Sequence, residues 1–153
     1  MKTIALLLLA TAAAWSSAAL ARDENPKFPI KNALDKGQQY KEKVGLDIPL
    51  YFGPQKTPGV EKRIGEWTST RNTNTANKPD QDACDIAFIS AVIALQERAR
   101  KEGGNAVISI KSLSKVGDVD SASEYICTSG RVIARVQLRG TAVKLGKAAG
   151  KKK

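Results

Sequence analysis

Residues 82–110 read DACDIAFISAVIALQERARKEGGNAVISI, and this stretch decides the fold. At 100° per residue, its first part predicts a long helix, which the pair Gly103-Gly104 ends. One helix face is apolar and carries Cys84, Ala87, Phe88, Ala91, Val92, Leu95 and Ala99. The opposite face carries Ile86, Ile89 and Ile93. A surface helix needs only one apolar face, so we expect this helix to be covered on both sides.

The two ends of the helix carry the residues that its dipole favours. Asn77 is the expected N-cap, and Pro79 is tolerated in the first turn, where N–H groups lack partners. The acidic residues Asp80, Asp82 and Asp85 suit the positive end. The basic residues Arg98, Arg100 and Lys101 suit the negative end. Helix capping therefore explains the three carboxylates without catalysis.

Strand patterns follow the helix. Residues 106–113 alternate, with Ala106, Ile108 and Ile110 expected to face the core. Residues 124–145 have strand composition throughout, with a bulge or turn expected at Ser129-Gly130. Beyond that point one strand face carries Val132, Ala134, Val136 and Leu138. The other face carries Arg131, Arg135, Gln137 and Arg139, so the last strand is predicted to have one apolar and one basic face.

Two shorter strands are predicted before the helix. Residues 46–52 have strand composition, and Pro49 places them at a sheet edge. Residues 60–70 alternate imperfectly and predict a second strand. Residues 71–78, RNTNTANK, predict a polar loop. Together these patterns predict an α+β fold in which one long helix packs on a small, mostly antiparallel sheet of βαββ type.

The start of the chain has the features of a secretory signal peptide. A short basic segment precedes an apolar run at residues 4–14, and Ala19-Leu20-Ala21 resembles a cleavage site. We therefore expect residues 1–21 to be removed and the mature protein to be periplasmic or secreted. No other apolar run approaches membrane length, so no membrane span is expected. No cysteine follows the cleavage site, so no lipid anchor is expected.

The remaining chain divides into three parts. Residues 22–45 predict an N-terminal arm that packs on the domain, residues 46–145 the α+β domain, and residues 146–153 a basic disordered tail. Loss of residues 1–21 removes one lysine, which leaves 24 basic against 15 acidic residues and a net charge of +9. Attraction to anionic surfaces follows from this charge. Export and the small number of aromatic side chains argue against nucleic acid as the partner.

Cys84 and Cys127 are the only cysteines in the chain. In an oxidising compartment an even pair predicts a disulfide. In the chain-entropy model, closing a loop of this length contributes roughly 4 kcal/mol to stability. The chain has no histidine, which excludes Ser–His and Cys–His nucleophiles. Two paired cysteines cannot supply a zinc site either, so no metal and no cofactor are expected.

Two surfaces are candidates for binding. Ile86, Ile89 and Ile93 are a candidate contact with a protein partner or a second copy of the chain, unless the N-terminal arm covers them. Arg131, Arg135 and Arg139 are a candidate contact with anionic envelope surfaces, unless they form an ordinary solvated strand face.

Two short motifs resemble a known family. Residues 99–108, ARKEGGNAVI, resemble the helix–GANAV–strand hallmark of YbjQ-like proteins, and residues 139–144, RGTAVK, resemble their closing GTAVK strand. The cysteine-containing version is similar to the RcsF-like envelope-stress sensors, in which a cysteine near the helix bonds one on the C-terminal strand. The chain also looks similar to small exported proteins labelled "excinuclease ATPase subunit". Residues 140–147, GTAVKLGK, do not fit a phosphate-binding loop, so that label implies no activity here.

The resemblance implies a helix packed on a small sheet. YbjQ-like proteins are often called heavy-metal-binding and form rings, but metal binding does not carry over to a chain without histidine and with its cysteines paired. The lipid anchor of RcsF-like proteins does not carry over either. We therefore expect an exported, soluble, non-enzymatic envelope protein that acts by binding, in the manner of a stress sensor. Electrostatic adherence to anionic envelope material is one alternative, and a hydrolase using carboxylates is another.

Overall fold

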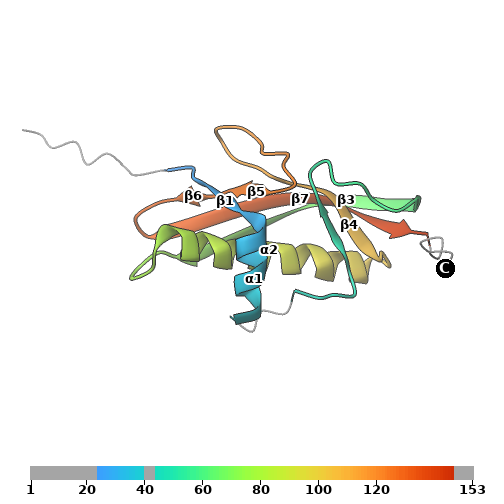
Figure 1. Ribbon diagram of the computed structural model, residues 1–153, viewed down its shortest axis with the longest axis horizontal. Coiled ribbons are helices and arrows are strands. Elements are labelled where there is room, and N and C mark those ends of the chain that lie inside the picture. The colour runs from blue at the N-terminus through green and yellow to red at the C-terminus, as the bar shows by residue number, and fades with distance from the viewer. Residues whose placement is uncertain (1–23, 40–43, 147–153) are drawn as a thin grey trace, which may run out of the picture.

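The computed structural model describes residues 24–39 and 44–146 (Figure 1). The predicted signal peptide and residues 147–153 of the predicted tail lie outside the described residues. The elements, in chain order, are β1 (Lys27–Pro29), α1 (Ile30–Gln39), β2 (Leu50–Phe52), β3 (Val60–Asn74), α2 (Asp80–Lys101), β4 (Ala106–Ser112), β5 (Glu124–Ile126), β6 (Thr128–Ser129) and β7 (Ile133–Leu145).

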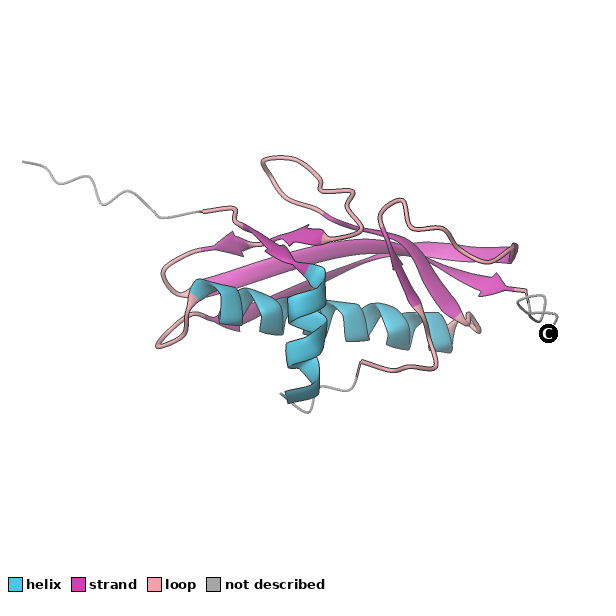
Figure 2. Ribbon diagram, in the orientation of Figure 1, coloured by secondary structure: helices cyan, strands magenta, loops and turns pink. Residues whose placement is uncertain are grey.

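The larger sheet is built around its last strand. Its order is β2-β4-β7-β3, and the short β6 pairs with β7 beside β4. All pairs are antiparallel except β2 with β4. β1 and β5 form a separate antiparallel pair. Figure 2 shows α2 lying along one face of the long β3–β7 ribbon. The predicted α+β class, with a long helix on a mostly antiparallel sheet, is confirmed.

The core lies between α2 and the sheet. Phe88, Val92 and Leu95 are buried against the α2-facing side chains of β4 and β7. Gly140 lies at the middle of this layer, where an added Cβ atom would come within 2.7 Å of Val107 Cγ1. A side chain at position 140 would therefore push α2 and the sheet apart.

The disulfide joins α2 to the segment between β5 and β6. The Cα atoms of Cys84 and Cys127 are 5.9 Å apart, and both residues are fully buried. The predicted break at Ser129-Gly130 is confirmed, because Gly130 N–H donates to Ile133 O in a tight turn before β7. Because of this turn, Cys127 faces α2. In an unbroken strand Cys127 would lie on the same face as Arg131, Arg135 and Arg139.

The strand boundaries differ from the prediction in two places. β3 continues to Asn74, through half of the segment 71–78 that was predicted to be a loop. The reason is tertiary pairing, because Arg71 to Asn74 continue the ladder opposite β7. β2 is also shorter than predicted and begins at Leu50, although it lies at the predicted sheet edge.

The predicted inward alternation of β4 holds only in part: Ala106, Ile108 and Ile110 are all buried, but only Ile110 lies in the core beneath α2. Ser109 adopts a φ of 52°, and the register with β7 shifts between Ile108 and Lys111. This irregularity reverses the strand faces. Val107 and Ile110 therefore join the main core, while Ala106 and Ile108 form a small second cluster with Val143.

The N-terminal end of α2 is capped differently from the prediction, whereas the C-terminal end agrees with it. Asn77 is not the N-cap: it has a φ of 59°, and the helix begins after Pro79 without a side-chain cap. At the other end Gly103 has a φ of 78°, and Gly104 N–H donates to Ala99 O. The predicted left-handed glycine end is therefore confirmed.

Candidate functional site

A groove opens on the sheet face opposite α2, where the two strands beside β7 separate. β6 pairs with the start of β7, with Thr128 opposite Arg135. β4 pairs with the later part of β7, and Leu113 N–H still donates to Gln137 O. Between these contacts lies a hollow of about 540 Å³. This volume is in the range of pockets that hold small ligands, which is roughly 300–1,000 Å³.

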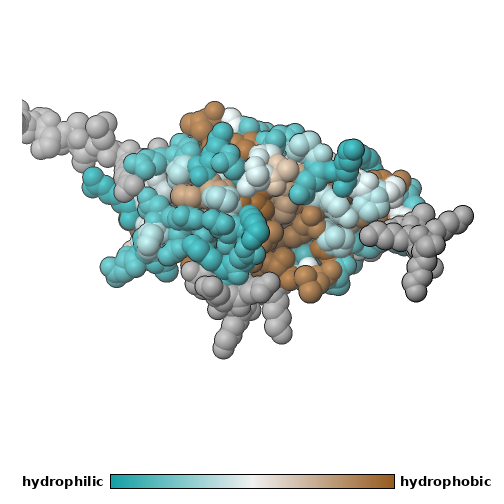
Figure 3. All heavy atoms as spheres, in the orientation of Figure 1, coloured by the Kyte–Doolittle hydropathy of each residue, from teal (hydrophilic) through white to brown (hydrophobic). Residues whose placement is uncertain are grey.

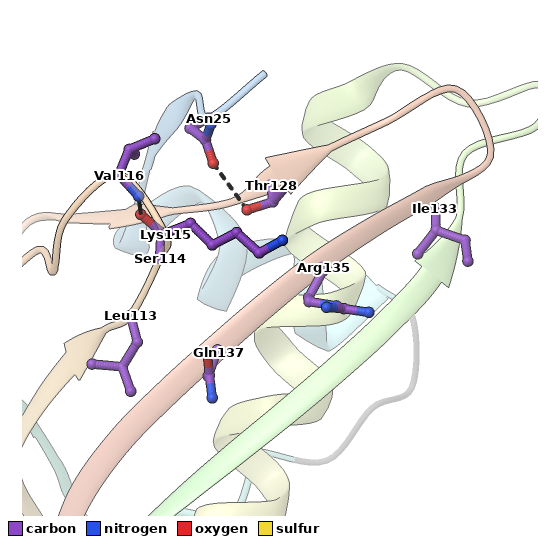
Figure 4. A pocket seen from close by; sticks show the side chains of 9 residues that line it. All are labelled: Asn25, Leu113, Ser114, Lys115, Val116, Thr128, Ile133, Arg135 and Gln137. Atoms are coloured by element: carbon purple, nitrogen blue, oxygen red, sulfur yellow. Dashed lines mark hydrogen bonds between the residues drawn. The ribbon is translucent and has the colours of Figure 1, made fainter. Parts of the chain in front are cut away.

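The groove combines cationic, hydrogen-bonding and apolar side chains. Its nine lining residues are Asn25, Leu113, Ser114, Lys115, Val116, Thr128, Ile133, Arg135 and Gln137. Figure 4 shows the side chains of β7 along the floor, with α2 behind the sheet, and Lys115 reaching across from the loop after β4. We call this hollow the β7 groove.

Lys115 and Arg135 give the β7 groove its charge. Lys115 extends toward the side of the groove where Arg135 lies (Figure 4). Arg135 Nε donates a 3.0 Å hydrogen bond to Asn72 Oδ1 of the neighbouring strand, which orients the guanidinium and uses one of its five N–H groups. None of the nine described lining residues is acidic, so the groove presents two positive charges to a ligand.

The polar and apolar parts of the lining lie around these cations. Thr128 Oγ1 donates a 2.9 Å hydrogen bond to Asn25 Oδ1, which holds the N-terminal arm against β6. Val116 is 67% exposed and Ile133 is 49% exposed, so two large aliphatic side chains border the groove in contact with solvent. An exposed aliphatic side chain at each end of the groove, with two cations between them, fits a ligand with both anionic and apolar parts.

The three predicted arginines do not form one surface. Arg135 lies in the β7 groove, and Arg139 lies further along the same face, with Nε 3.8 Å from Glu66 Oε1 of β3. Arg131 is exposed in the turn before β7, because the strand begins only at Ile133. The predicted basic strand face therefore loses Arg131, and it gains Lys115 from a loop that sequence periodicity did not connect with it.

The three predicted contact isoleucines are largely covered by the chain itself. Ile89 is fully buried, and an added Cβ atom on Gly37 of α1 would lie 3.4 Å from Ile89 Cδ1. Ile89 is therefore not available to a partner, because the N-terminal arm lies on it. Ile86 and Ile93 are half-buried. Figure 3 shows hydrophobic residues at the surface beside α1, over α2.

A buried polar network joins the arm to the domain. Lys36 Nζ of α1 donates to Asp82 Oδ1 at 2.7 Å and to Asp85 Oδ2 at 2.9 Å. Tyr125 Oη of β5 donates to Asp85 Oδ1 at 2.6 Å. The two carboxylates raise the pKa of Lys36. Burial, and then the hydrogen bond to Asp85, raise the pKa of Tyr125. Two of the three acidic residues at the start of α2 therefore hold the arm.

Within residues 24–39 and 44–146, no three of the His, Cys, Asp and Glu side chains gather as a metal site would require. No helix in the described part of the chain is long and apolar enough to cross a membrane. The buried disulfide is compatible with a location outside the cytoplasm.

Sequence reasoning missed most of the β7 groove. Asn25, Lys115 and Thr128 come from three segments that no periodic pattern relates. The available signals were Arg135 and Gln137, on the polar side of an alternating strand.

Comparison with known proteins gives distant structural likeness alone. No model of a protein family matches the chain, and no curated protein matches it. A crystal structure of a protein of unknown function from the DUF74 family of Pediococcus pentosaceus is similar, with 17% identity and a TM-score of 0.46. The match covers 65% of this chain and 97% of that one.

Proposed function

We propose that this chain is an exported, non-enzymatic protein of the cell envelope that binds anionic groups in the β7 groove. One observation carries the proposal: Lys115 and Arg135 line one hollow that has no acidic lining residue among the described ones. Two cations on one concave surface attract an anion more strongly than the same charges spread over a convex surface. The net charge of +10 acts in the same direction.

The alternative of a carboxylate hydrolase has less support. Asp85 is fully buried, and both it and Asp82 are bound by Lys36. A general acid or base must reach its substrate within hydrogen-bonding distance. These two carboxylates instead face the arm, so their arrangement supports a structural role.

Retention on isolated envelope material tests the proposal. We expect binding of the full chain to fall steeply as salt rises, because exposed charges are screened beyond about 10 Å at 0.1 M. The double variant Lys115→Ser with Arg135→Ser should lose most of the retention. The matched control is Lys62→Ser with Lys144→Ser, which removes the same charge from a site where these lysines pair across β3 and β7. Equal losses in both variants would mean that net charge, and not the groove, causes retention.

A further inference from the structure

The floor of the β7 groove has the spacing of an extended peptide. Ile133, Arg135 and Gln137 are alternate residues of β7 and all line the groove. At about 3.3 Å per residue, the first and last of them lie roughly 13 Å apart. This length matches about four residues of extended chain. Figure 4 shows the three side chains following one another along the strand.

The walls of the groove carry groups that match peptide amides. Asn25 and Gln137 line it with carboxamide groups, which can both donate and accept hydrogen bonds. Ser114 and Thr128 add hydroxyl oxygens that can accept, since their protons go to Gly117 O and Asn25 Oδ1. A phosphate group takes up mainly donors and cations. A peptide backbone presents N–H and C=O groups in alternation, so it can use both kinds of group.

The charged and apolar side chains of the groove determine which side chains a bound peptide should carry. Lys115 and Arg135 would face carboxylates, and an Arg–carboxylate pair can form two parallel hydrogen bonds. Val116 and Ile133 border the groove with exposed aliphatic surface, which an apolar side chain of the ligand would cover. A polar anion, by contrast, would leave this surface exposed.

We propose that the β7 groove binds an extended acidic peptide segment of about four residues that also carries apolar side chains. The inference rests on the proposed anion binding and adds the class of ligand to it. Lys115 and Arg135 hold the carboxylates, the amide and hydroxyl groups of the walls hold the peptide backbone, and Val116 and Ile133 each cover an apolar side chain at one end of the groove.

Fluorescence anisotropy with three labelled tetrapeptides tests this inference on the full mature chain. The probes carry the dye on the N-terminal nitrogen and an amide at the C-terminus, and their sequences are Glu-Val-Glu-Val, Gln-Val-Gln-Val and Glu-Ser-Glu-Ser. We expect Glu-Val-Glu-Val to bind at least about tenfold more tightly than the glutamine peptide, because charged hydrogen bonds are lost with glutamine. We expect it to bind about fivefold more tightly than the serine peptide, because serine buries less apolar surface.

Two double variants locate the site. Lys115→Ser with Arg135→Ser should abolish the preference for glutamate over glutamine. Val116→Ser with Ile133→Ser should abolish the preference for valine over serine and leave the charge preference intact. All four positions are on the surface or half-exposed, and the fold of each variant is checked by its thermal unfolding. Leu46→Ser, at a side chain that is 98% exposed and outside the groove, is the control for a lost aliphatic side chain.

The outcomes separate this inference from the proposed function. If inorganic phosphate competes fully and the valine and serine peptides bind equally, the groove is a simple anion site, and the peptide inference falls while the proposed function stands. The same holds if vesicles containing phosphatidylglycerol bind through Lys115 and Arg135 and no peptide does. If no anionic probe depends on Lys115 and Arg135, both proposals fall.

Discussion

Tyr125 Oη donates a 2.6 Å hydrogen bond to Asp85 Oδ1, and through this bond a strand of the small sheet holds a carboxylate of the long helix. Lys36 Nζ reaches the other oxygen of the same carboxylate at 2.9 Å. Asp85 is fully buried, whereas the Lys36 side chain is 30% exposed. The buried charge is therefore neutralised by a residue of the N-terminal arm, and the stability of the domain depends on the arm.

The first prediction concerns this ion pair. Replacing Lys36 by Met leaves the buried Asp85 without its cation, and we expect a loss of about 1–3 kcal/mol in the free energy of unfolding. The matched control is Lys31→Met, one turn away in α1, which breaks the exposed pair with Asp35. That change should cost less than about 1 kcal/mol. Urea unfolding followed by circular dichroism measures both, and equal losses would contradict a structural role for Asp85.

The second prediction concerns alkaline pH. The pKa values of Lys36 and Tyr125 are both raised in the folded protein above their ordinary values of 10.5 and 10.0. Above about pH 10 the unfolded chain therefore releases protons that the folded chain retains, so stability is present below this pH and falls as pH rises further. Urea midpoints measured from pH 8 to 11 should decrease. The decrease should be smaller in Tyr125→Phe, and an unchanged slope in that variant would remove Tyr125 as a cause.

The third prediction concerns the disulfide. Cys84 and Cys127 are separated by 43 residues and anchor β5 and β6 to α2. Replacing both by serine should cost about 2–5 kcal/mol, mainly because the unfolded chain gains freedom. Thiol titration in denaturant should find no free thiol in the mature protein. Two free thiols in the purified protein would contradict the bond.

The fourth prediction separates the arm from a partner as the cover of the isoleucines. Ile89→Ala should cost about 2–5 kcal/mol because it leaves a cavity under α1. Ile89→Glu should unfold the domain, since the glutamate would be buried without a partner. The control is Ile93→Ala, at a half-buried position, which should cost less. A folded Ile89→Glu monomer that had lost an assembly would instead show that a partner covers this residue.

Local patterns were sufficient to predict α2, its glycine end and the disulfide. They worked because α2 is periodic over 22 residues and because two cysteines allow one pairing. Local patterns failed where contacts between distant segments determine the structure. Nothing local indicates that Asn72 continues a strand, because its place is fixed by pairing with Arg135. Nothing local indicates the φ of Ser109 that reverses the faces of β4.

Local patterns also failed to predict which polar residues are buried. Asp85 has the position of a dipole-stabilising residue, but it is buried against Lys36 and Tyr125. Gln96 also lies in α2 and is fully buried, and its Nε2 donates to both Gly45 O and Ile48 O at 2.7 Å. Their partners come from segments 40 or more residues away in the chain. The β7 groove could not be predicted for the same reason. Its lining residues come from separate segments that lie together only where β4 and β6 diverge along β7.

The position of β7 in the sheet determines when this protein can fold during synthesis. β7 is the last strand to leave the ribosome, and it is the neighbour of β3, β4 and β6. Until it is complete, β3 has no partner and α2 has no full sheet to cover, and the larger sheet is limited to the short parallel contact between β2 and β4. Non-local pairing of this kind forms slowly. A chain shortened before Ile133 therefore cannot form the native larger sheet, which is complete only once β7 is present.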